Sequence, residues 1–161
     1  LFGQCNSIAG PIKSCLLLFH SLYENPELVV KNSMRLSDIQ FINVTSHQLL
    51  IEGAAKYFCE GSSILSIGSV ASRIPGVSET TYGPLKAALS NFIKAIKYKC
   101  LERGIGITDV VLGAVKTPMT QGRSNYNSLI NSEEVADILL KLVHNYETMN
   151  IDEITISRAK K

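Results

Sequence analysis

The chain has 161 residues, of which 45% are hydrophobic and 19% are charged, a composition typical of soluble globular proteins. The net charge of +2 and the scattered lysines and arginines argue against a nucleic-acid or membrane surface, and no apolar run approaches the roughly 20 residues of a membrane-spanning helix. The length predicts a single domain over residues 1–161. From the charge and the apolar runs we expect no nucleic-acid or membrane partner.

The cysteine and histidine pattern argues against a metal site. The chain contains no C-x-x-C pair and no histidine at zinc spacing. Its four isolated cysteines are Cys5, Cys15, Cys59 and Cys100. We expect free thiols, and we expect His47 and His144 on helix surfaces. With no recognisable signal peptide, the predicted compartment is the reducing cytoplasm.

Strand-like and helix-like segments alternate in the first half of the chain. Residues 15–20 are a continuous apolar run, which predicts a strand covered on both faces. Residues 37–58 have the apolar spacing of a helix, with Ser37 as the expected N-cap. Residues 63–67 predict a second strand, and residues 72–81 predict a loop.

The second half continues the alternation. Ser132, followed by two acidic residues, is expected to cap the last helix. Strands separated by helices imply βαβ units, right-handed crossovers and a mainly parallel sheet. The expected segments are a helix at 82–103, a strand at 107–112, a loop at 120–131, a helix at 132–146 and a strand at 151–157.

Three residues around the second strand predict proton-transfer chemistry. Ser69 ends the segment that contains this strand, Tyr82 follows thirteen residues later, and Lys86 lies four positions beyond Tyr82. Positions i and i+4 of a helix share one face, so the Lys86 ammonium would lie beside the Tyr82 phenol. A nearby cation favours a phenolate. With Ser69 bonded to the same substrate oxygen, Tyr82 would serve as a general acid aimed at a carbonyl.

The order of these motifs resembles the short-chain dehydrogenase/reductase family. Asn43 in the first long helix, Ser69 at a strand end, Tyr82-x-x-x-Lys86 and the turn Leu112-Gly113-Ala114-Val115-Lys116-Thr117 match the family's pattern and intervals over residues 15–157. The resemblance implies an α/β fold, a Rossmann-like doubly wound parallel sheet in three α/β/α layers. It also implies an NAD(P)-dependent oxidoreductase that interconverts a secondary alcohol and a carbonyl by hydride transfer.

The resemblance also assigns catalytic roles. Tyr82 would be the general acid/base, Lys86 would assist it and hold the nicotinamide ribose, and Ser69 would orient the substrate oxygen. Asn43 would hold a water that links Lys86 to solvent. Two structural alternatives remain open, since Asn43 could satisfy a helix kink and Ser69 could cap the end of a strand.

The turn after the third strand would contact the nicotinamide end of the cofactor. By resemblance, the backbone at Gly113 and Val115 and the hydroxyl of Thr117 would join Tyr82 and Lys86 in this task. An alternative role for Thr117 is to cap the turn that begins at Pro118.

The amino end departs from the family's pattern. Residues 1–10 resemble an altered form of its glycine-rich phosphate turn, in which Gly3, Ser7 and Ile8 would contact the cofactor. In that interpretation residues 15–20 replace the family's N-A-G strand. Alternatively, residues 1–10 are that strand and the phosphate-binding half is absent. Both interpretations predict a shortened enzyme whose preference for NADP or NAD is not readable, and a non-catalytic relative with a structural or oligomerisation role is the alternative function.

The two long predicted helices resemble those that pair between subunits in the family. Leu101 and Tyr57 are apolar residues outside the main stripes of these helices. A homodimer or homotetramer that acts on a small-molecule alcohol or carbonyl substrate is therefore the expected assembly.

Overall fold

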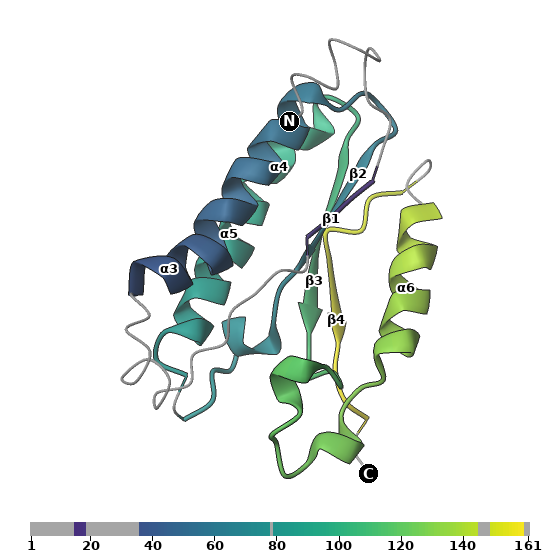
Figure 1. The fold of residues 1–161 in the computed structure, drawn as a ribbon. Coiled ribbons are helices and arrows are strands. Elements are labelled where there is room, and N and C mark those ends of the chain that lie inside the picture. Colours follow the sequence, from purple (N-terminus) through teal and green to yellow (C-terminus); the bar gives the residue numbers. More distant parts are fainter. Residues whose placement is uncertain (1–14, 19–35, 78, 145–148, 160–161) are drawn as a thin grey trace.

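Four parallel strands form the centre of the computed structural model, which describes residues 15–18, 36–77, 79–144 and 149–159 (Figure 1). The sheet order is β1-β2-β3-β4, and Ile64 pairs with Leu16 on one side and with Ile107 on the other. The strands are β1 (Cys15–Leu18), β2 (Ser63–Ile67), β3 (Gly106–Leu112) and β4 (Glu153–Ile156). The predicted Rossmann-like parallel sheet is thereby confirmed.

Helices cover the sheet on both faces, which gives three layers (Figure 1). One face carries α3 (Leu36–Gln40), the π-helical turn η1 (Phe41–Thr45), α4 (Ser46–Tyr57) and α5 (Tyr82–Leu101). The other face carries α6 (Ser132–His144). Short 3₁₀ turns follow the strands: η2 (Val70–Ser72), η3 (Pro118–Thr120) and η4 (Tyr126–Ser128).

The alternation of side chains along β2 explains the two hydrophobic cores. All five residues of β2 are buried, as expected for a parallel strand covered on both faces. Ile64 packs with Ile51 of α4 and Leu89 of α5, whereas Leu65 packs with Leu142 of α6. The apolar stripes predicted for the helices at residues 37–58 and 82–103 thus face the same side of the sheet, and α6 covers the other side.

One prediction about the crossovers is wrong. The connections β2–α5–β3 and β3–α6–β4 step across the sheet in the same direction, but their helices lie on opposite faces. Two such connections have opposite hands, so they cannot both be right-handed. The cause is the open apolar face of β2 and β3, which α6 covers because α5 already occupies the other side.

The first long helix differs from its prediction in two ways. It begins at Leu36, so Ser37 lies inside the helix. It also contains the π turn, in which the Ser46 N–H donates to the Phe41 carbonyl five residues earlier. The extra residue in this turn rotates the residues that follow it. His47, expected on the surface, is fully buried, because it lies on the same face of α4 as Ile51 and Ala54, and its Nδ1 lies 3.5 Å from Ser66 Oγ on β2.

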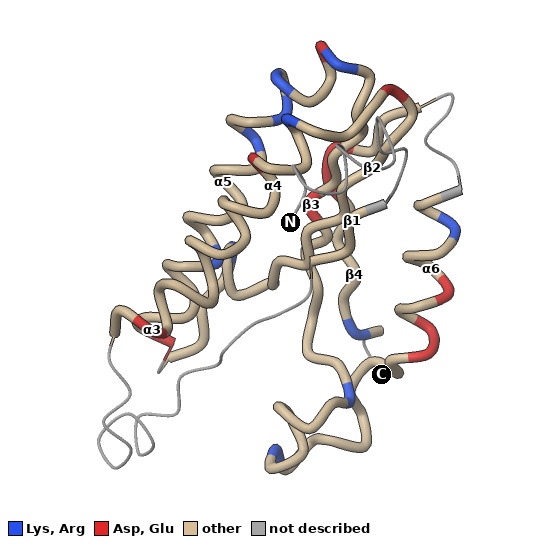
Figure 2. Tube along the Cα trace, turned by 45° about the horizontal axis from the view of Figure 1, so that its top comes forward, with Lys and Arg blue, Asp and Glu red and all other residues tan. Residues whose placement is uncertain are grey.

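The start of α6 also differs from the prediction by one residue. Asn131 Oδ1 accepts a hydrogen bond of 3.0 Å from the Glu133 N–H, so Asn131 performs the capping expected of Ser132. Acidic residues occupy the first turn of α6 and a basic residue lies near its other end, which complements the helix dipole (Figure 2). Among the described residues, no helix combines the length and the hydrophobicity that crossing a bilayer requires.

Candidate active site

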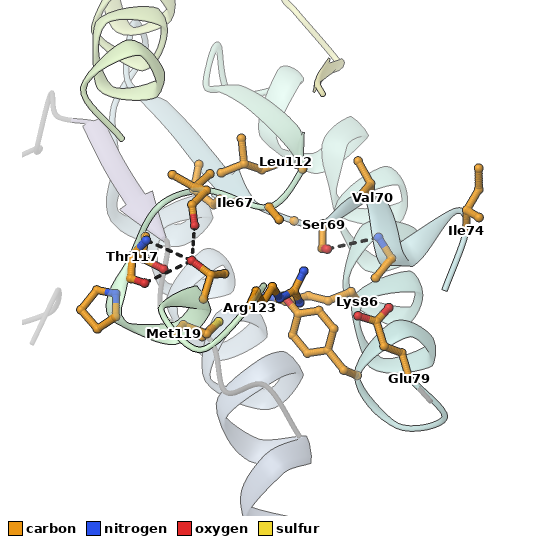
Figure 3. Close-up of a pocket in the computed structure, with 18 residues that line it drawn as sticks. Ile67, Ser69, Val70, Ile74, Glu79, Lys86, Leu112, Thr117, Met119 and Arg123 are labelled. Carbon is orange, nitrogen blue, oxygen red and sulfur yellow. Dashed lines mark hydrogen bonds between the residues drawn. The ribbon is translucent and has the colours of Figure 1, made fainter. Parts of the chain in front are cut away.

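A pocket of about 410 Å³ opens where β2 and β3 end, beside the start of α5 (Figure 3). The carboxyl ends of parallel strands are where α/β proteins bind ligands, because the loops that follow the strands converge there. Ser69, Tyr82 and Lys86 line this pocket together with Gly113, Val115 and Thr117. Six of the seven site residues that could be placed are thus gathered in one cavity, and the seventh, Asn43, is not part of its lining.

Lys86 is the most unusual side chain in the pocket. Its residue is only 1% exposed, and its Nζ has no hydrogen-bond partner. Nζ lies 5.7 Å from the centre of the Tyr82 ring, as expected for an i, i+4 pair on one helix face. Burial lowers the pKa of Lys86 from 10.5 to about 8, and the negative charge of Asp109 acts against this decrease. Burial therefore makes the ammonium form of Lys86, which lies beside the Tyr82 phenol, energetically unfavourable.

Close packing at the start of α5 fixes the position of Tyr82. A Cβ at Gly83 would lie 2.8 Å from Pro75 Cβ and 3.1 Å from the Ala71 carbonyl oxygen. Only glycine allows α5 to begin this close to the loop after β2. Pro84 is tolerated because the N–H groups of a first helical turn lack intrahelical partners. This packing brings Tyr82 beside the residues that follow Ser69.

Ser69 caps a turn and also lines the pocket, and its role in orienting a substrate oxygen stays a prediction. It lies two residues after the end of β2 at Ile67, and its Oγ accepts a hydrogen bond of 3.1 Å from the Ala71 N–H, which caps η2. Its carbonyl accepts a second bond, of 2.6 Å, from Ser72 Oγ. Since the same residue lines the pocket, its hydroxyl is held in place by the cap while it faces the cavity (Figure 3).

Asn43 lies in the π turn rather than in the pocket wall. It is fully buried, and its Nδ2 donates a hydrogen bond of 2.9 Å to the Ile39 carbonyl four residues earlier. Ser46 Oγ donates to the Ile42 carbonyl in the same turn, also at 2.9 Å. The side chain thus stabilises a helix irregularity, which is the kink alternative, and the π turn packs against α5. Its role in a water-mediated relay stays a prediction.

The turn after β3 is held by a residue that the sequence analysis missed. Thr120 Oγ1 donates to the Val115 carbonyl at 2.5 Å and accepts from the Thr117 N–H at 3.1 Å (Figure 3). The pattern Thr117-Pro118-x-Thr120, a threonine and proline ahead of a second hydroxyl, was the available signal. Gly113 begins this turn, and its N–H donates to the Ile156 carbonyl of β4 at 2.8 Å.

A second missed feature is a buried acid behind the pocket. Asp109 of β3 is 1% exposed, and its Oδ2 accepts a hydrogen bond of 2.5 Å from Ser90 Oγ on α5. Arg73 lies 3.7 Å from the same oxygen and also pairs with Glu153 at 2.5 Å. Burial raises the pKa of Asp109, whereas the Ser90 hydrogen bond and the Arg73 charge act in the opposite direction. An acid within a strand of mostly apolar residues was the signal in the sequence.

Three of the predicted cofactor contacts, Gly3, Ser7 and Ile8, lie outside the described residues. Within the described residues, no cluster of three or more histidine, cysteine, aspartate or glutamate side chains is arranged to hold a metal ion. Cys59 and Cys100 are free thiols.

A parallel Rossmann-like sheet, with serine, tyrosine and lysine side chains in a pocket at its strand ends, defines the fold class of the protein. A family model described as enoyl-(acyl carrier protein) reductase matches residues 27–151. The chain belongs to the short-chain dehydrogenase/reductase family.

Individual relatives are distant. An uncharacterised oxidoreductase of Staphylococcus epidermidis is 24% identical over 118 residues, which cover 71% of this chain and 51% of that protein. A short-chain dehydrogenase from Burkholderia cenocepacia, solved with NADP, superposes with a TM-score of 0.79 at 21% identity over 97% of this chain and 68% of its own. A 3-oxoacyl-[acyl-carrier protein] reductase from Brucella melitensis, solved with NAD, gives 0.76 at 18% identity over 96% and 69%. The chain spans about half the length of the curated relatives it matches.

Proposed function

We propose that this chain is the catalytic part of an NAD(P)-dependent oxidoreductase that interconverts a secondary alcohol and a carbonyl. The observation that carries the proposal is the meeting of Ser69, Tyr82 and Lys86 in one pocket at the strand ends. Membership of the family and relatives solved with NADP and NAD support it. The preference between the two nucleotides stays open.

The pocket fits the nicotinamide end of such a cofactor. Lys86 Nζ is buried and lacks a hydrogen-bond partner, so it offers charged donors where a ribose hydroxyl would accept them. Gly113, Val115 and Thr117 would face the nicotinamide from the opposite side of the cavity. When bound, the cofactor supplies the hydride. The residues proposed for its phosphates, Gly3, Ser7 and Ile8, stand as sequence-based expectations.

The side chains of the pocket divide the work of proton transfer. Tyr82 would donate its phenolic proton to a carbonyl oxygen during reduction and accept it back during oxidation. Lys86, as an ammonium, would stabilise the phenolate, and Ser69 would hold the substrate oxygen through its positioned hydroxyl. Asn43 would hold a water that returns the proton to Lys86 from solvent. Because the pKa of Lys86 is about 8, its assistance would fade as the pH rises through this value.

Titration of the purified chain with NADPH and NADH, followed by cofactor fluorescence and thermal unfolding, tests the cofactor assignment. We expect saturable binding of one or both, with stabilisation of roughly 2.7 kcal/mol at 100 times the dissociation constant. Lys86→Ala should weaken binding, whereas Lys99→Ala, which removes an exposed lysine from the same helix, should not. A folded chain that binds neither nucleotide would favour the alternative, a non-catalytic relative with a structural role.

Turnover separates catalysis from binding. Tyr82→Phe removes the proton donor and keeps the ring, so it should lower carbonyl reduction by a factor of about 10² or more while changing nucleotide affinity far less. Equal turnover by wild type and Tyr82→Phe would contradict the assignment of Tyr82. The substrate class is a small alcohol or carbonyl compound, and exposed apolar residues at the rim, Ile74 and Met119, would contact it.

Assembly and compartment are proposed with the function. Tyr98 and Leu101 on α5 are 71% and 38% exposed, which leaves apolar surface for a homodimer or homotetramer. Sedimentation analysis would distinguish these from a monomer. The cytoplasm stays the predicted compartment.

A further inference from the structure

Five buried polar side chains form a band between the sheet and the helices α4 and α5. They come from four different elements, and each is at most 2% exposed. Ser66 and Asp109 are register partners on β2 and β3, so their side chains share the face that α4 and α5 cover. The five residues are His47, Ser66, Lys86, Ser90 and Asp109. Burying so many polar groups together raises the free energy of the fold unless each group is compensated.

Two of its atoms stand out. Lys86 Nζ and Asp109 Oδ1 are the buried side-chain nitrogen and oxygen atoms of the described residues that lack a hydrogen-bond partner. One belongs to a cation and the other to an anion. An isolated buried charge costs several kcal/mol unless an opposite charge compensates it. The two groups therefore have reason to be buried together.

The position of Asp109 connects it to the pocket. A Cβ at Gly68, which lines the pocket beside Ser69, would lie 2.8 Å from Asp109 Oδ1. The unpartnered oxygen thus lies directly beneath the pocket floor, and the absence of a side chain at Gly68 leaves room for it. On its other side, Oδ2 is held by Ser90, one helical turn after Lys86 on α5.

We propose that Asp109 is a positioning residue, whose carboxylate beneath the pocket floor favours the ammonium form of Lys86 through its charge, without a direct ion pair between the two groups. Ser90 and Arg73 fix the carboxylate through Oδ2, which leaves Oδ1 toward the pocket. The charge coupling of Asp109 to Lys86 is independent of the proposed function, and its use in proton transfer at Tyr82 rests on that function. No motif of the sequence analysis included Asp109.

Other titratable groups face this pair and limit what the test can use. Tyr82 lies beside Lys86 on α5, and His47 of α4 contacts Ser66, the register partner of Asp109. Glu153 of β4 and Lys94 of α5 act on Asp109 with opposite signs, and Arg73 adds a third charge. A measurement of the Lys86 titration itself separates its pKa from the titrations of these neighbouring groups.

The test is an NMR titration of lysine ¹³Cε in labelled protein, with the Lys86 signal assigned from the Lys86→Met spectrum. In Asp109→Asn the pKa of Lys86 should fall below its wild-type value of about 8 by roughly one pH unit. Asp152→Asn removes an exposed carboxylate that pairs with Lys97, so it should leave Lys86 unchanged. An unchanged Lys86 titration in folded Asp109→Asn overturns the proposal.

A reciprocal measurement keeps the proposal testable where Asp109→Asn fails to fold. Thermodynamic linkage requires that removing the Lys86 charge shifts Asp109 by the same coupling. In Lys86→Met, the ¹³Cγ signal of Asp109 should therefore titrate at a higher pH than in wild type, and identical titrations overturn the proposal. A chain that shows these shifts but binds neither NADPH nor NADH supports the coupling and contradicts the proposed function.

Discussion

The two faces of the sheet bury different chemistry. The face under α4 and α5 holds Lys86 and Asp109 among its buried side chains, whereas the face under α6 is an apolar cluster around Leu65, Val110 and Leu142. Thr108, the buried polar residue of β3 on the α6 side, donates its hydroxyl to the Ile151 carbonyl at 2.5 Å. Neighbouring residues of one strand thus point a charge to one face and apolar groups to the other.

This difference separates a face that mainly stabilises the fold from a face that also carries the charged groups of the candidate site. The α6 face contributes burial without desolvating charge, at roughly 25 cal/mol per Å² of apolar surface. The α4/α5 face also contains an apolar core, yet it desolvates two opposite charges beside the pocket. Active sites commonly carry such costs, because perturbed charges are useful there. Four substitutions can break or sharpen this comparison.

Moving a carboxylate to the apolar face should have the largest effect. Val110→Asp places an unpaired acid at a fully buried position and should cost roughly 4 kcal/mol or more, enough to unfold many domains. Thr155→Asp adds the same group at an exposed position of β4 and should change stability by about 0.5 kcal/mol or less. Denaturant unfolding measures both. A Val110→Asp chain as stable as Thr155→Asp would contradict the distinction between the faces.

Removing the charge from the polar face should have the opposite sign. The pKa of Lys86 is lower in the folded chain than unfolded, so the unfolded chain binds the proton more tightly between pH 8 and 10.5. Lys86 therefore destabilises the fold below about pH 8, and this cost disappears as the pH rises toward 10.5. Lys86→Met should stabilise the fold at pH 7 by roughly 3 kcal/mol.

The pH dependence supplies the control for this prediction. The stability difference between Lys86→Met and wild type should shrink as the pH rises from 8 to 10.5, because Lys86 is already neutral in the folded wild type and only the unfolded chain still loses its proton over this range. Unfolding free energies at pH 7, 9 and 10.5 measure it. A difference that is constant across these values would show that lost packing, rather than charge, governs the substitution.

A methyl group at Gly68 should produce an intermediate effect. Its Cβ would meet Asp109 Oδ1 at 2.8 Å, so Gly68→Ala should cost roughly 1–3 kcal/mol through displacement of the buried carboxylate. Gly122→Ala places the same methyl where nothing lies within 4 Å and should be nearly neutral. A double-mutant cycle with Asp109→Ala should recover about 0.5 kcal/mol or more, and additive effects would locate the strain elsewhere.

These effects also show what the sequence could predict. The strands followed from apolar runs, and Ser69, Tyr82 and Lys86 followed from local spacing, because one strand end and one helix face determine where they lie. The proposed charge coupling of Asp109 to Lys86 could not be predicted from the sequence, since it depends on how α5 packs on β3. The surface prediction for His47 treated it as an isolated histidine, whereas it shares the buried face of α4 with Ile51 and Ala54 and reaches Ser66 of β2.

The cap of α6 offers the smallest and most local test of such differences. Sequence spacing selected Ser132, but in the structure the Asn131 side chain accepts the bond from the Glu133 N–H. Asn131→Ala should therefore cost about 1 kcal/mol, whereas Ser132→Ala, an exposed first residue of the helix, should change stability by less than about 0.5 kcal/mol. Thermal unfolding resolves the two. A larger loss of stability in Ser132→Ala than in Asn131→Ala would show that Ser132 is the N-cap, as the sequence predicted. The start of α6, the helix that covers the apolar face, would then lie one residue later.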